Sequence, residues 1–142
     1  MTYFISGHRD ITPEEFEKYY VPAIMEAMVE NVPDYPYFVV GDYWGVDEMA
    51  QEFLSKFNET HPDLVEKNGK FPADHVTVYH MFEKPRAYVD NRFLTKGGFG
   101  DDESRDAAMT KNSDIDIAFV RPGKRKSGTA QNIVRRYEMR DE

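Results

Sequence analysis

The strongest chemical signal in this 142-residue sequence is a basic segment that precedes the last predicted helix. Lys124–Lys126 is followed by Ser127, Gly128 and Thr129, and the helical pattern begins near Thr129. The first N–H groups of a helix lack partners within it and carry a partial positive charge, so a turn of small residues lets a phosphate approach them. The segment therefore predicts an anion site, and the alternative is an ordinary helix cap beside a solvated basic tail.

A second candidate group follows the first apolar run of the chain. Gly7, His8 and Arg9 stand there, and both a histidine and an arginine can bind phosphate, while a histidine can also act as a general acid. The structural alternative for Arg9 is a surface ion pair with Asp10. The four histidines of the chain do not show the helical spacing of a metal site, so we expect neither a metal nor a cofactor.

A third candidate group lies in the turn from Gly41 to Asp47, which also contains Gly45. Asp47 is a carboxylate that can accept hydrogen bonds from ribose hydroxyls, and Tyr43 or Trp44 can stack on a base. Each side chain has a structural alternative, because the first turn of a helix favours an acid and aromatic rings also cover the ends of sheets.

The elements that must position these turns alternate between strand and helix. Apolar runs predict strands over residues 2–6, 37–40, 75–80 and 115–120. Apolar periodicity predicts helices after Thr12, from Val46 to about Phe57, from about Asp102 to Asn112, and from near Thr129. This alternation predicts a single-domain α/β protein, a Rossmann-like three-layer sandwich with a mainly parallel sheet over residues 1–142. Ligands bind such sheets beyond the carboxyl ends of the strands, where the turns described above lie.

Other parts of the chain carry weaker signals. Residues 58–74 are polar and contain two prolines and a glycine, which predicts a long surface connection. Residues 81–102 contain several glycines and no clear periodicity, which predicts an irregular loop of a kind that is often functional. In the last helix, the apolar residues are expected to face inward; they are Ala130, Ile133, Val134 and Tyr137.

Composition excludes several classes of protein. The chain has no cysteine, which rules out disulfides and thiolate metal sites. The net charge of −8 argues against general binding to nucleic acid. The charge is unevenly distributed, however. Residues 121–142 carry seven Lys or Arg against three Asp or Glu, a net charge of +4, which leaves −12 on residues 1–120. The chain lacks the G-x-G-x-x-G and P-loop motifs. It shows neither a membrane-spanning run nor a signal-peptide pattern, so we expect no membrane partner and a cytoplasmic location.

The motifs together resemble the SLOG superfamily of Rossmann-like nucleotide-binding proteins, most closely its YspA/YpsA-like branch. The superfamily also includes the DprA proteins and the cytokinin-activating phosphoribohydrolases. The resemblance is carried by Ser6–Arg9, by the Gly-Val-Asp end of the 41–47 turn, by Arg105-Asp-Ala-Ala-Met109, by the Ile-Ala-Phe strand, and by Ser127-Gly-Thr-Ala-Gln-Asn-Ile133. It implies a nucleotide cleft, in which Arg105 matches the arginine of a phosphoribohydrolase motif.

One position departs from the enzymes of that superfamily. Their Gly-Thr turn is followed by a catalytic glutamate, and the aligned residue here is Asn132. An amide cannot serve as a carboxylate nucleophile or base, so the resemblance implies binding without turnover unless another acid takes over. Asp42, Asp47 and Glu48 are the acids on the relevant loops.

The sequence therefore predicts a protein that binds a phosphorylated nucleoside or related nucleotide, for sensing or sequestration. The expected ligand-binding residues are Gly7, His8, Arg9, Gly41, Trp44, Gly45, Asp47, Arg105, Lys124, Ser127, Gly128 and Thr129. One alternative is an enzyme that acts on nucleoside N-glycosidic bonds, with Asp47 and Asp42 as catalytic candidates. Another is a subunit whose basic C-terminal helix docks on an acidic partner. The apolar content is also compatible with a homodimer.

Overall fold

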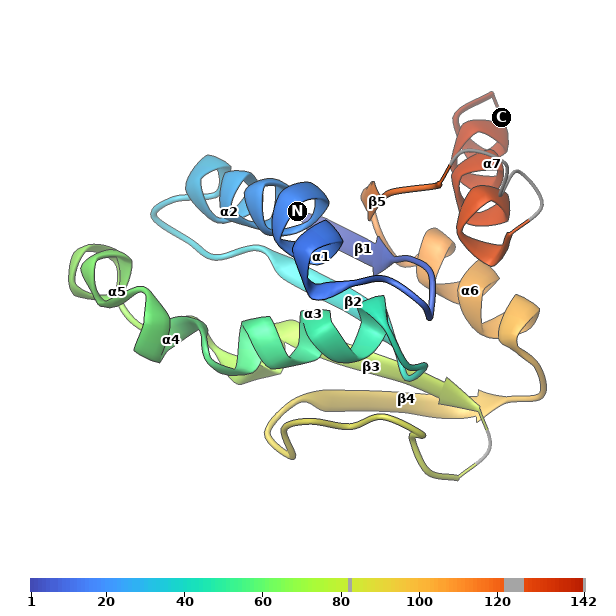
Figure 1. Ribbon diagram of the computed structural model, residues 1–142, viewed down its shortest axis with the longest axis horizontal. Helices are drawn as coiled ribbons and strands as arrows, with labels where there is room; N and C mark the ends of the chain where they lie inside the picture. Colours follow the sequence, from blue (N-terminus) through green and yellow to red (C-terminus); the bar gives the residue numbers. More distant parts are fainter. Residues whose placement is uncertain (82, 122–126, 142) are drawn as a thin grey trace.

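The computed structural model describes residues 1–81, 83–121 and 127–141, and it confirms the predicted Rossmann-like α/β sandwich (Figure 1). Five strands form one parallel sheet in the order β4-β3-β2-β1-β5. The strands are β1 (Thr2–Ser6), β2 (Tyr37–Gly41), β3 (Val76–Met81), β4 (Leu94–Phe99) and β5 (Ile115–Ala118). The chain builds the sheet outward from β1 to β4 and then returns to the other side of β1. The strand order thus reverses between β1 and β5, where sheets of this kind form ligand crevices.

Helices cover both faces of the sheet because alternate strand residues face opposite sides. The helices are α1 (Pro13–Tyr19), α2 (Val21–Glu30), α3 (Val46–Ser55), α4 (Phe57–Thr60), α5 (Pro62–Asn68), α6 (Asp102–Lys111) and α7 (Gly128–Asp141), with a short 3-10 turn, η1 (Ala73–His75).

The sheet separates two cores. Ile5, Val40 and Ile117 are register neighbours on adjacent strands, and all three lie in the larger core with residues of α1, α2 and α3. Phe4 belongs to a second core on the other face, together with Met109 of α6.

The helix predicted after Thr12 is interrupted once. Thr12 and Glu15 form a capping box at its start, as their spacing indicates. A proline at position 22 cannot donate a backbone hydrogen bond, so α1 ends at Tyr19 and α2 begins at Val21. The apolar periodicity nevertheless continues across this break, because the residues at every fourth position are all buried; they are Phe16, Tyr20, Ile24 and Met28.

Two of the irregular segments hold elements that the sequence did not indicate. Residues 58–74 contain α5 and parts of α4 and η1, which bury few side chains and therefore leave little apolar periodicity. Residues 81–102 contain β4, an edge strand with mostly exposed side chains and hence no alternating pattern. Gly97 of β4 lies directly against the His80 ring, which leaves no room for a Cβ and explains a glycine within a strand. The strand predicted over 115–120 is shorter and ends at Ala118.

The orientation predicted for the last helix is wrong for two of its four residues. Val134 and Tyr137 are 53% and 62% exposed, whereas Ala130 and Ile133 are partly buried. Over residues 128–139, the buried side chains of α7 are those of Thr129, Asn132 and Arg136. The inward face of α7 is polar because it meets the edge of the sheet and the end of α6 rather than an apolar layer. Arg136 illustrates this, since its guanidinium donates hydrogen bonds to the Ser113 carbonyl oxygen at 2.6 Å and to Asp116 Oδ1 at 3.0 Å.

Tyr20 ties the carboxyl ends of β1 and β5 together. Its buried hydroxyl donates to the Ser6 carbonyl oxygen at 2.8 Å and accepts from the Phe119 N–H at 3.0 Å. Burial raises the pKa of Tyr20 to about 12, so the hydroxyl keeps its proton at neutral pH. The two strand ends that flank the crevice are therefore joined by one side chain.

We expect Tyr20→Phe to lower the free energy of unfolding by about 1–3 kcal/mol, because the buried Ser6 carbonyl and the partly buried Phe119 N–H lose a partner. Denaturant unfolding measures this change. Tyr19→Phe is the matched control, since Tyr19 is partly exposed and its ring keeps its stacking on Phe119. Equal stability of the two variants would contradict the structural role of the Tyr20 hydroxyl.

Candidate functional site

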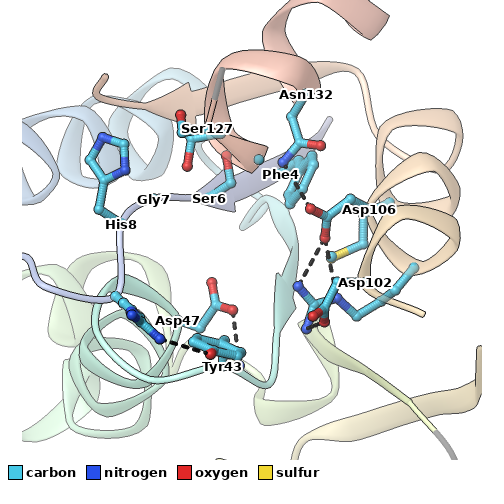
Figure 2. Close-up of a pocket in the computed structure, with 15 residues that line it drawn as sticks. Phe4, Ser6, Gly7, His8, Tyr43, Asp47, Asp102, Asp106, Ser127 and Asn132 are labelled. Atoms are coloured by element: carbon cyan, nitrogen blue, oxygen red, sulfur yellow. Dashed lines mark hydrogen bonds and ion pairs between the residues drawn. The ribbon is translucent and has the colours of Figure 1, made fainter. Parts of the chain in front are cut away.

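A cavity of about 250 Å³ opens at the point where the strand order reverses (Figure 2). Its walls come from the end of β1 and the loop after it, from the turn before α3, from α6, and from the start of α7. The lining residues are Phe4, Ser6, Gly7, His8, Arg9, Tyr43, Asp47, Asp102, Arg105, Asp106, Met109, Ser127, Gly128, Thr129 and Asn132. Segments far apart in the sequence thus meet here, as the parallel sheet requires.

Most of the expected ligand-binding residues line this cavity; they are Gly7, His8, Arg9, Asp47, Arg105, Ser127, Gly128 and Thr129. Gly41, Trp44 and Gly45 do not line it, and neither do the acids Asp42 and Glu48. The expected basic contribution of Lys124–Lys126 lies outside the described residues.

The residues outside the lining have structural contacts. Trp44 is half exposed and its ring lies edge-on to Tyr43, with centroids 4.7 Å apart. Gly45 has a φ of +76°, and a Cβ there would lie 2.5 Å from backbone atoms of His8 and Arg9. A glycine is therefore required for the 41–47 turn to pack against the loop after β1. Asp42 is fully buried and accepts a hydrogen bond from Arg105, which does line the cavity.

Ser6 brings an unsatisfied polar group to the cavity. The residue is only 6% exposed, and its Oγ has no hydrogen-bond partner among the described residues. Buried hydroxyls are normally hydrogen-bonded, and leaving one unpaired costs free energy. Two other buried atoms, Thr110 Oγ1 and Arg136 Nε, also have no hydrogen-bond partner among the described residues, but neither residue lines the cavity. The Ser6 hydroxyl is thus placed to bond to a ligand.

The N-terminus of α7 forms the wall that includes Gly128 and Thr129. Ser127 caps the helix, since its Oγ accepts from the Ala130 N–H at 3.1 Å and its carbonyl oxygen accepts from the Gln131 N–H at 3.0 Å. A Cβ built on Gly128 would lie 3.8 Å from Asp106 Oδ2, an ordinary contact, so Gly128 stands beside open space. The partial positive charge of this helix end therefore faces the cavity.

Carboxylates line two other sides of the cavity, and one of them, Asp106, lies beside Asn132 of α7 (Figure 2). Asp47 enters from α3, and Asp102 and Asp106 enter from α6. Arg105 donates to Asp106 Oδ1 at 2.9 Å and to Asp42 Oδ1 at 2.6 Å. Its charge is thus already compensated by two acids, so Arg105 positions this wall instead of presenting an unpaired cation to a phosphate.

Burial changes the acidity of this wall. Burial raises the pKa of Asp47 to about 7, against the opposing effects of Arg105 and of the Tyr43 N–H, which donates to Asp47 Oδ2 at 3.0 Å. Burial likewise raises the pKa of Asp106, although Arg105 opposes it. For Asp42 burial acts in the same direction, but hydrogen bonds from Arg86 prevail and hold its pKa below the usual range. Raised carboxyl pKa values in a cavity are typical of functional sites.

The loop after β1 forms the remaining side of the cavity. His8 is buried, and its Nε2 accepts from the Arg121 N–H at 3.2 Å. Arg9 is exposed, and its Nη1 lies 3.5 Å from the Tyr43 hydroxyl. Asp10, the ion-pair partner in the structural alternative for Arg9, forms an ion pair with Arg121 at 2.8 Å. Arg9 is consequently available near the mouth of the cavity.

The sequence reasoning missed the contribution of α6 beyond Arg105. Asp102 and Met109 stand three and four positions from Arg105. Asp106 follows Arg105 directly and stands four positions from Asp102 and three from Met109, and all three residues line the cavity. This spacing was the signal that could have found them. The low apolar periodicity of α6 concealed it, because the face that meets the cavity is charged.

Comparison with known proteins adds no identification, since no family model, curated protein or solved structure matches this chain. Among the described residues, no helix is long and apolar enough to cross a membrane. Over the same residues, no group of three or more His, Asp or Glu side chains has the arrangement of a metal site.

Asp47 gives the protein a pH-dependent stability. Its pKa in the fold, about 7, is above the ordinary value of 3.8, so the folded state holds a proton that the unfolded chain loses as pH rises above about 4. The stability from neutral Asp47 is therefore present at low pH and lost as pH rises through 7. We expect Asp47→Asn to stabilise the protein relative to wild type by about 1–3 kcal/mol more at pH 8 than at pH 5.

Denaturant unfolding at the two pH values measures this difference. Glu48→Gln is the control, because Glu48 is the exposed neighbour on the same helix. If the effect of Asp47→Asn on the free energy of unfolding is the same at pH 5 and pH 8, Asp47 is already ionised at pH 5 and the description of its burial is wrong.

Proposed function

We propose that the protein binds a phosphorylated nucleoside, or a related nucleotide, in this cavity, for sensing or sequestration. The observation that carries the proposal is the unpartnered, buried Ser6 hydroxyl in the same cavity as the N-terminus of α7. A phosphate can accept hydrogen bonds from both, and its charge is favoured by the helix end. His8 and Arg9 line the same cavity and add donors or positive charge. The resemblance to the SLOG superfamily supports the same assignment and stays a proposal with it.

The other walls suit the remaining parts of such a ligand. Asp47 and Asp106 offer acceptors to sugar hydroxyls, and Tyr43 offers an aromatic ring beside them. The ligand would thus lie with its phosphate at α7 and its sugar against the carboxylates.

Asn132 supports binding in preference to turnover. It lines the cavity in the first turns of α7, where the resemblance places a glutamate in related enzymes. Its Oδ1 accepts from Arg135 Nη1 at 2.5 Å, and its Nδ2 lies 3.4 Å from Asp106 Oδ2. The side chain is engaged as a neutral amide and has no nucleophilic oxygen to offer.

Thermal shift with a panel of nucleoside 5′-monophosphates tests the proposal, and we expect at least one to raise the Tm. Gly128→Asp should abolish this shift, because a new carboxylate would repel both the phosphate and Asp106. Gly128→Ala is the matched control and should retain binding, since its Cβ fits. Ser6→Ala should weaken binding roughly tenfold, the value of a hydrogen bond to a charged group. The proposal fails if no monophosphate stabilises the protein or if Gly128→Asp binds like wild type.

A specific observation favours a second candidate function, hydrolysis of the nucleoside N-glycosidic bond. Asp106 stands beside Asn132 in the cavity, so an acid is present next to the position where one is absent. With Asp106 as base, water would add to the anomeric carbon and the nucleobase would leave with a proton from solvent or from Asp47.

Incubation of nucleoside monophosphates with the protein, followed by chromatography of the free base, tests this second candidate. If it holds, we expect release that Asp106→Asn abolishes and that Glu103→Gln leaves unchanged. Release that is equal in Asp106→Asn, or no release by the wild-type protein, would exclude Asp106 as the acid.

The hypothesis that the C-terminal helix docks on an acidic partner gains no such support. Two of its arginines already have partners inside the chain, since Arg136 pairs with Asp116 and Arg135 with Asn132.

A further inference from the structure

Of the three described carboxylates in the cavity lining, Asp47 has the least contact with positive charge. Asp102 and Asp106 both form ion pairs with Arg105, at 3.3 Å and 2.9 Å. Asp47 takes part in no ion pair within the described part of the chain, and its Oδ2 accepts from the Tyr43 N–H at 3.0 Å. Ionised Asp47 is therefore a buried charge without a paired cation, which is a costly state in a protein.

Asp47 is only 7% exposed, and charged or titratable groups surround it on several elements. They are Asp42 at the end of β2, Asp102, Arg105 and Asp106 of α6, the Tyr20 hydroxyl, and His8 and Arg9 of the loop after β1, which line the same cavity. Arg105 favours the ionised form, but its guanidinium group is shared with Asp42 and Asp106. Burial therefore prevails and raises the pKa of Asp47 to about 7, so the group is about half protonated near neutral pH.

Asp47 shares the cavity with the groups that are proposed to bind a phosphate. Figure 2 shows its carboxyl group directed from the α3 side into the space that Ser6 and Ser127 border. The cavity is small, about 250 Å³, so a phosphate at the N-terminus of α7 stays close to this carboxyl group. Repulsion between like charges is strong in such surroundings, because the effective dielectric constant is well below that of water. An ionised Asp47 thus opposes a bound phosphate, and a neutral Asp47 does not.

We infer that the protein takes up a proton on Asp47 when the phosphorylated ligand binds, so that a rise in pH releases the ligand. This inference rests on the proposed binding of a phosphorylated nucleoside in the cavity. It gives Asp47 a regulatory role, since the neutral carboxyl group removes the repulsion, still offers an acceptor to a sugar hydroxyl, and gains an O–H donor. Because binding and protonation are linked, each favours the other by the same factor.

The sign and size of the effect follow from this linkage. The bound phosphate raises the pKa of Asp47 above its value of about 7 in the free protein. Between these two pKa values, each bound ligand takes up close to one proton, and the affinity falls by up to about tenfold per pH unit. The ligand itself does not cause this change above about pH 7.5, since a phosphate monoester has a second pKa of about 6 and is already a dianion.

Calorimetric titration measures both quantities in the wild-type protein. Adenosine, guanosine, cytidine and uridine 5′-monophosphates are each titrated at pH 6.5, 7.5 and 8.5. We expect the affinity of those that bind to fall roughly five- to tenfold from pH 7.5 to pH 8.5. Titration at pH 7.5 in Tris and in HEPES, which differ in their heats of ionisation, gives the number of protons taken up, and we expect more than half a proton per ligand.

One variant assigns the proton to Asp47. Asp47→Asn imitates the neutral form, so its affinity should be nearly independent of pH between 7.5 and 8.5, without proton uptake. At pH 8.5 it should bind about tenfold more tightly than wild type, and at pH 6.5 within a few-fold of it. Glu48→Gln is the charge-matched control, because Glu48 is the exposed neighbour on α3 and lies outside the cavity lining. This control should keep the pH dependence of the wild-type protein.

The outcomes separate the inference from the proposed function. Equal affinity at pH 7.5 and 8.5, or binding without proton uptake, would overturn the inference while leaving nucleotide binding intact. Proton uptake that persists in Asp47→Asn would also overturn it and would assign the proton to another group of the cavity, such as His8. The wild-type measurements keep the test decisive if the variant does not fold. Absence of binding by all four nucleotides at every pH would remove the proposed function and the inference together.

Discussion

Two arginines from distant parts of the chain converge on one buried carboxylate, Asp42, at the end of β2. Arg105 of α6 reaches it at 2.6 Å, and Arg86 bonds to it through both its side chain and its backbone N–H. Breaking such a buried pair typically costs about 3–5 kcal/mol, because it leaves a charge without compensation. This ion network joins the segment after β3, the end of β2 and α6 into one unit. The position of the carboxylate wall depends on it, since Arg105 also holds Asp106.

Asp42 is a buried carboxylate whose charge is well compensated, whereas the charge of Asp47, nearby, is poorly compensated. Asp47 is buried close to Arg105 but receives only the Tyr43 N–H as a hydrogen bond, so burial dominates its pKa. A carboxyl group in this state lowers the stability of the protein at neutral pH. Such a cost is common where a group serves a ligand instead of the fold. The unpaired Ser6 hydroxyl on the opposite side fits the same description.

Close packing of two loops sets the shape of the cavity. Gly7 lies against Tyr20 and Val46 with no space for a Cβ, and Gly45 lies equally close to the backbone at His8. Substitution of either glycine would push the loop after β1 away from the start of α3. The glycines thus act by allowing two backbones to meet, while polar side chains beside them line the cavity. Glycine-rich turns here are structural supports of the site.

The sequence by itself determined the α/β alternation, the parallel sheet and the turns that carry the cavity, because those depend on local apolar periodicity and on the rule that parallel strands share one carboxyl edge. Tertiary structure decided which side chains of those turns enter the cavity. Trp44 and Asp42 stay outside the lining, while Asp106 joins it from a helix face whose charged residues gave no apolar pattern. Tertiary structure also decided that β4 forms and which face of α7 points inward. Neither follows from apolar periodicity, because the side chains of β4 are mostly exposed and the inward face of α7 carries Arg136. Burial, pairing and pKa arise from neighbours far apart in the chain, and spacing along a sequence carries little information about them.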